Sequence, residues 1–106
     1  MPRRFRNTVG PKVRLLRKER RLTQDQLAAR LALSGLESAD RVYVAKIESQ
    51  IRSVFDFELI VLAQVLGVTT EQLIPTFEQM RPNLPELQKG LRKTIPSRRP
   101  RRTGSD

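Results

Sequence analysis

Two short amphipathic helices, separated by a polar break, constrain the fold of this chain more than any other feature of its sequence. The first is expected over residues 24–33, with Thr23 as its N-cap. The second is expected over residues 41–49, after a break in which Ser38 or Asp40 could act as the cap. Apolar residues recur at helical spacing in both, namely Leu27, Ala28, Leu31, Val44 and Ile47. The pattern predicts a small domain in which these two helices share one core.

The sequence on either side continues the helical pattern. A first helix is expected from about Thr8, as its N-cap, into the charged run 18–21. A fourth ends before Gly67, and a fifth opens with a capping box at Thr69 and stops near Pro75. The buried stripes of the first and fourth helices would be Val9, Val13, Leu16, Leu59, Leu62, Ala63 and Leu66. No strand pattern competes, so we expect an all-α domain of five helices over residues 8–80.

The net charge of +10 lies mainly in the ends of the chain. Residues 1–7 carry +3 and residues 81–106 carry +6, whereas the middle of the chain carries only +1. Residues 1–7 are therefore expected to form a basic arm. Residues 81–106 are expected to form a Pro- and Arg-rich flexible tail that is mostly disordered, with at most one or two amphipathic turns through Leu84, Leu87 and Leu91. Basic tails on a neutral core favour a polyanionic partner, although such tails can also serve solubility alone.

The composition argues against catalysis. The chain of 106 residues has no Cys and no His, which removes disulfides, thiolate metal sites and the commonest general base. No glycine-rich phosphate loop occurs, so we expect no enzyme activity, no cofactor and no metal. No apolar run reaches the length of a membrane span, and no apolar segment follows the basic N-terminus as in a secretory signal. We therefore expect a cytoplasmic protein with no membrane partner.

Two charged residues fall where apolar residues belong. On a helical wheel, Glu48 shares the side of Val44 and Ile47, and Arg17 lies at the edge of the apolar stripe of the first helix. Buried charges are seldom left unpaired, so we expect an Arg17–Glu48 ion pair that holds the helix over 41–49 against the rest of the domain. The alternative is that both side chains point to water at the rim of the core.

The chain resembles the Cro and phage-repressor (XRE-type) helix-turn-helix transcriptional regulators. The resemblance covers roughly residues 8–75. The matching residues are Val13, Leu16, Arg17, Leu22, Thr23, Gln24, Leu27, Ala28, Val44, Ala45, Lys46, Ile47, Glu48, Leu59, Ala63, Leu66, Gly67, Val68 and Leu73. It implies a five-helix, lambda-repressor-like DNA-binding domain that reads the major groove with the helix at about 41–49.

This sequence departs from the family pattern in two places. Gln24 and Glu48 are separated by about six positions more than is usual, which indicates an extended turn before the recognition helix. The glycine that usually follows the recognition helix is Gln50 here, and Gln is less suited to a positive φ.

The resemblance and the side-chain chemistry together suggest roles for particular residues. Arg41 and Lys46 can donate hydrogen bonds to guanine, Val42 can contact a thymine methyl, and Ala45 shares their face. Phosphate contacts are expected from Gln24, Tyr43, Ser49 and Arg52, although Tyr43 could equally pack within the protein. The basic residues of the arm, Arg3, Arg4 and Arg6, could enter an adjacent minor groove.

The expected function is that of a sequence-specific, repressor-like regulator whose partner is double-stranded DNA. A homodimer is expected by analogy, because such proteins usually bind two half-sites. One alternative is a module of the same fold that binds a protein partner and touches nucleic acid only through its tails. A basic RNA-binding protein is a weaker alternative, because only 5% of the residues are aromatic and no RNP-type strand motif occurs.

Overall fold

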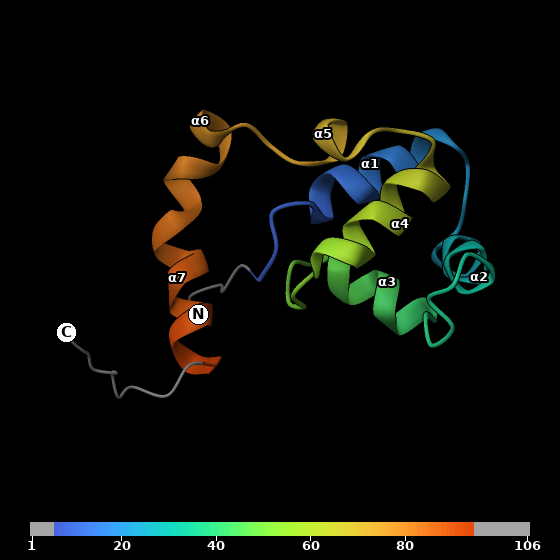
Figure 1. The fold of residues 1–106 in the computed structure, drawn as a ribbon, viewed down its shortest axis with the longest axis horizontal. Helices are drawn as coiled ribbons and strands as arrows, with labels where there is room; N and C mark the ends of the chain where they lie inside the picture. The colour runs from blue at the N-terminus through green and yellow to red at the C-terminus, as the bar shows by residue number, and fades with distance from the viewer. Residues whose placement is uncertain (1–5, 95–106) are drawn as a thin grey trace.

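The computed structural model describes residues 6–94 (Figure 1). All regular structure in this part of the chain is helical, which confirms the expected all-α class. The elements are α1 (Gly10–Glu19), α2 (Gln24–Leu33), α3 (Arg41–Glu48), α4 (Asp56–Leu66), α5 (Thr70–Leu73), α6 (Phe77–Met80), the 3-10 helix η1 (Arg81–Asn83) and α7 (Leu84–Thr94).

Helices α1 to α5 enclose one hydrophobic core. Helix α3 packs against α1 and α2, while α4 packs against α1, α2 and α5. Figure 1 shows α3 and α5 on opposite sides of the layer formed by α1 and α4. The buried apolar residues include every one expected in the helices over 24–33 and 41–49, and the full set is Val9, Val13, Leu16, Leu22, Leu27, Ala28, Leu31, Val44, Ile47, Leu62, Ala63, Leu66 and Leu73. Leu59, expected in the core, is only partly buried and packs at its edge.

Local capping determines where most helices begin. Thr23 caps α2 and Thr69 caps α5, as expected, and both form a capping box, which was expected only at Thr69. Asp40, one of the two expected candidates, caps α3 by accepting a hydrogen bond of 2.8 Å from the Tyr43 N–H. The prediction for α1 was wrong, because its N-cap is Val9 and Thr8 makes no cap. Asn7 supplies the acceptor instead, taking the Gly10 N–H at 2.9 Å.

The extended turn between α2 and α3 is ordered by its own apolar residues. Gly35 adopts a φ of +119°, which ends α2. The Leu36 N–H then donates to the Leu31 carbonyl at 3.0 Å, and both Leu36 and Ala39 pack against the core. The additional residues thus form a compact connection that brings Asp40 to the start of α3.

Gln50 occupies the left-handed conformation that usually calls for glycine, with a φ of +65°. The N–H groups of Gln50 and Ile51 close the end of α3 onto the carbonyls of Ile47 and Lys46. The Gln50 side chain donates to the Asn7 carbonyl at 3.1 Å. This contact with the N-terminal segment is one that glycine could not make.

The C-terminal part contains more helix than expected. Residues 81–106 were expected to be mostly disordered, but η1 and α7 extend regular structure to Thr94. Figure 1 shows α7 beside the α1–α5 bundle, and no residue of this helix whose burial is described belongs to the main core. Within residues 6–94, no single helix is long and apolar enough to cross a membrane, and one sharply bent pair, Asp56–Leu66 with Thr70–Lys89, passes by length and composition only.

Candidate nucleic-acid interface

Helix α3 presents its expected base-reading residues on one exposed face. Arg41, Val42 and Lys46 are exposed and Ala45 is partly exposed, whereas Val44 and Ile47 are buried on the opposite side. The exposed face surrounds a shallow hollow of about 240 Å³. The lining residues are Arg41, Val42, Ala45, Lys46, Ser49 and Ile51. The structure therefore brings the four expected base-reading residues, Arg41, Val42, Ala45 and Lys46, together on one surface.

The predicted Arg17–Glu48 ion pair is present. Arg17 Nε donates to Glu48 Oε2 at 2.6 Å, and Nη2 donates to Oε1 at 3.1 Å. Arg17 Nη1 also donates to the Leu22 carbonyl at 2.8 Å. Only 10% of the Arg17 side chain and 4% of the Glu48 side chain are exposed. Helix α1 is thus joined to α3 by a bidentate, largely dehydrated contact.

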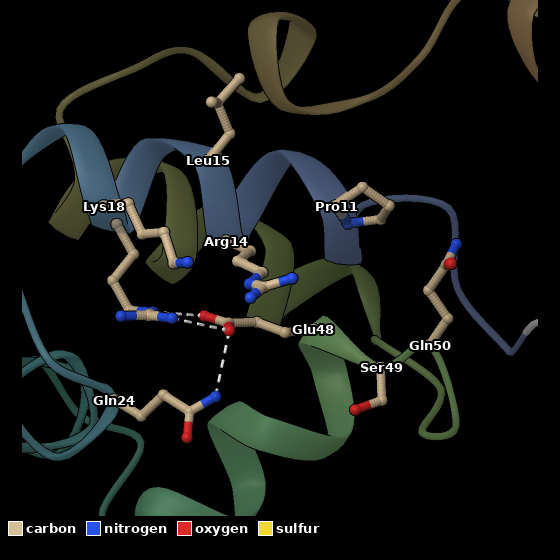
Figure 2. A pocket seen from close by; sticks show the side chains of 9 residues that line it. Pro11, Arg14, Leu15, Lys18, Gln24, Glu48, Ser49 and Gln50 are labelled. Carbon is tan, nitrogen blue, oxygen red and sulfur yellow. Dashed lines mark hydrogen bonds and ion pairs between the residues drawn. The ribbon is translucent and has the colours of Figure 1, made fainter.

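Gln24 supports this ion pair from the first residue of α2. Its Nε2 donates to Glu48 Oε1 at 3.1 Å, and Figure 2 shows its amide oxygen directed away from the carboxylate. Sequence reasoning assigned Gln24 to a phosphate and did not foresee this bond. The side chain is only partly exposed, so its clearest role within the protein is to position Glu48.

Tyr43 and Arg52, both expected to contact phosphate, bond to Glu58 within the protein. The Tyr43 hydroxyl donates to Glu58 Oε2 at 2.9 Å, and Arg52 Nη1 lies 3.1 Å from the same carboxylate. The Arg52 guanidinium carbon also lies 4.4 Å from the centre of the Tyr43 ring. For Tyr43 the structure shows the packed alternative, and a phosphate contact by either residue stays a prediction.

Glu58 is a buried residue that sequence reasoning missed. Besides Tyr43 and Arg52, its carboxylate accepts the Phe55 N–H at 2.8 Å, which fixes the start of α4. Burial raises the pKa of Glu58, but the hydrogen bonds from Arg52, Phe55 and Tyr43 together hold this pKa below its ordinary value. Burial and the bond to Glu58 raise the pKa of Tyr43 well above its ordinary value. An acidic residue three positions after a helix N-cap was the available signal.

The last residues of the expected arm are attached to the end of α3. The Arg6 N–H donates to the Gln50 carbonyl at 2.8 Å. The Asn7 amide donates to the carbonyls of Ile47, at 3.1 Å, and Arg52, at 2.8 Å. Asn7 is buried and belongs to the domain rather than to the arm, which corrects the expected boundary at residue 8. Arg3 and Arg4 lie outside the described residues.

A larger groove adjoins the exposed face of α3, and Ser49 lines both hollows. The groove encloses about 750 Å³ between α1, the start of α2 and the end of α3. Figure 2 shows the side chains of Arg14 and Lys18 extending from α1 into the groove, whereas Leu15 points away from it. The Ser49 hydroxyl donates to the Ala45 carbonyl at 2.7 Å. Sequence reasoning did not single out Arg14 or Lys18, although their i, i+4 spacing was a usable signal.

The described residues contain no group of three or more acidic side chains arranged to hold a metal ion. Comparisons of the chain with protein-family models, with curated proteins and with solved structures found no match.

Proposed function

We propose that this protein is a sequence-specific, repressor-like DNA-binding regulator that reads the major groove with α3. The observation that carries the proposal is the exposed face formed by Arg41, Val42, Ala45 and Lys46. An α-helix fits the major groove of B-DNA, where Arg and Lys can pair with guanine and a valine methyl can contact thymine. Resemblance of the sequence to the XRE-type regulators supports the same function.

The contacts at both ends of α3 also support the proposal. Base reading requires side chains held in register with the DNA, and contacts that orient the whole domain provide that register. Glu48 joins the last turn of α3 to α1, and the Asn7 amide donates to the carbonyl of Ile47 in the same turn. The cap by Asp40 fixes its first turn. A helix held at both ends suits discrimination between bases.

The experiment that tests the proposal is selection of bound sequences from random double-stranded DNA with the full chain. Enrichment of one motif, followed by protection of that site in a footprint, is the expected result. The stoichiometry on the enriched site also tests the homodimer expected by analogy, because two half-sites would bind two chains. Uniform recovery of all sequences with a steep salt dependence would contradict base reading.

A second candidate function is a protein-binding module, and one surface favours it. Three apolar side chains at or near the start of α4 are each more than half exposed, namely Phe55, Phe57 and Ile60. The two phenylalanine rings are stacked, with their centroids 5.9 Å apart. Exposed apolar groups of this kind often mark interaction sites. Under this alternative, Phe57→Ser would abolish partner binding, while Lys46→Ala would leave it unchanged.

A further inference from the structure

We propose that Arg14 and Lys18 of α1 bind the DNA phosphate backbone in the groove beside α3, as a contact separate from base reading. This inference rests on the proposed function, because it names the part of the DNA that the groove receives. The side chains lie one helical turn apart on an exposed face of α1. Figure 2 shows both directed into the groove.

The charge in the groove is positive in spite of Glu48. The Glu48 carboxylate accepts two hydrogen bonds from Arg17 and one from Gln24, so its charge is matched by a guanidinium. No ion pair within the described part of the chain involves Arg14 or Lys18. Two like charges at i, i+4 repel each other, and an anion between them would relieve that repulsion.

The position of the groove indicates which anion this is. Ser49 lines both the groove and the hollow on the reading face of α3, so the two surfaces are continuous. A duplex seated on the reading face would carry one of its sugar–phosphate strands past the edge of the major groove. Because the groove continues from that face through Ser49, a backbone phosphate is its expected occupant. Arginine and lysine are both established phosphate ligands.

Lys12 provides a matched control on the same helix. It is exposed and carries the same charge, but it lines a different hollow, next to α5. A general effect of net charge would appear equally in Lys12→Gln and Lys18→Gln. Loss of a phosphate contact in the groove would change the salt dependence of DNA binding only in the variants at positions 14 and 18.

The test measures the dissociation constant for the selected DNA as a function of salt concentration. Each lost phosphate contact should make the slope of log K against log salt shallower by about 0.9. We expect a shift of roughly 2 for the Arg14→Gln, Lys18→Gln double variant and none for Lys12→Gln. The preferred sequence should be unchanged. Arg14→Lys with Lys18→Arg should retain the slope, and thermal melting should confirm that each variant is folded.

The outcomes separate this inference from the proposed function. If the double variant has the slope of Lys12→Gln while the wild type selects a sequence, the groove contact is overturned and base reading stands. If the double variant changes which bases are preferred, the groove contact is likewise overturned, because the residues would be acting through α3. If the wild type selects no sequence, both proposals fail.

Discussion

Arg17 and Glu48, which lie 31 positions apart in the sequence, form a bidentate ion pair that fastens the last turn of α3 to α1. Each partner is further bound, Arg17 by the Leu22 carbonyl and Glu48 by Gln24. A buried charge that loses its partner lowers the stability of the folded state strongly, so we expect the domain to depend on both residues of this pair.

Glu48→Ala is expected to lower the free energy of unfolding by about 3 kcal/mol, because it leaves the Arg17 guanidinium without its counter-charge. Chemical denaturation would measure the change, and DNA affinity should fall with it. Glu19→Ala is the matched control, since Glu19 pairs with Arg20 at the surface and its loss should cost under about 0.5 kcal/mol. An unchanged melting temperature for Glu48→Ala would refute a structural role for the pair.

Gly10→Ala is expected to destabilise the protein, although alanine normally stabilises a helix by about 1 kcal/mol relative to glycine. A Cβ at Gly10 would press into the Ile47 carbonyl oxygen, so α1 and α3 would have to separate. The expected loss is about 1–3 kcal/mol in denaturant unfolding. Lys12→Ala, at an exposed position of the same helix, should be nearly neutral. Stabilisation by Gly10→Ala would contradict the close packing of these helices.

Glu58 should make the domain sensitive to acid. Its pKa is lower in the folded protein than in the unfolded chain, so its stabilisation is present above roughly pH 4.3, the unfolded-state value. That stabilisation is lost as the pH falls through the folded-state pKa. Glu58→Gln should therefore be less stable than the wild type at pH 7, with a smaller difference at pH 3. Unfolding free energies at the two pH values measure this, and a difference that is constant with pH would contradict it.

Tyr43→Phe tests the same network without removing the carboxylate. The change deletes one hydrogen bond to Glu58 and should lower the free energy of unfolding by about 1 kcal/mol. The packing of Arg52 on the ring would remain. Because the phenol donates to the charged form of Glu58, the pKa of Glu58 should rise in this variant, which a carboxyl NMR titration would detect. An unshifted titration would exclude the bond in solution.

Arg41→Ala and Lys46→Ala test base reading residue by residue. Each substitution should weaken the free energy of DNA binding by about 1–3 kcal/mol through one base-pair position, and should relax the base preference at that position. The measurement compares affinities for the selected site and its single-base variants. Lys12→Ala should leave all of these affinities nearly equal to those of the wild type. Equal weakening on every sequence would show that Arg41 and Lys46 serve only as phosphate contacts.

Much of the fold could be predicted because its signals are local. Thr23 and Thr69 cap helices through bonds to residues three positions away, and the periodicity of Leu27 and Leu31 defines a buried face. The Arg17–Glu48 pair was an exception at long range. It was predictable because a charge at an apolar position of each helix required a partner.

The features that escaped prediction depend on contacts between distant segments. Nothing near Asn7 indicates that its amide binds the carbonyl of Ile47, 40 positions away. The bond from Tyr43 to Glu58 was missed for the same reason, because only the packing of α4 brings this carboxylate to the hydroxyl.

The sequence alone determined the helical class, the extents of α2 and α3, and the four residues exposed on α3, because helical periodicity and capping operate within one or two turns. The tertiary structure decided which polar side chains bond to one another and which line the groove. Gln24, Tyr43 and Arg52 were drawn into internal bonds, whereas Arg14 and Lys18 were left facing a groove. The physical reason is that a polar side chain partly removed from water by packing gains from a partner inside the protein.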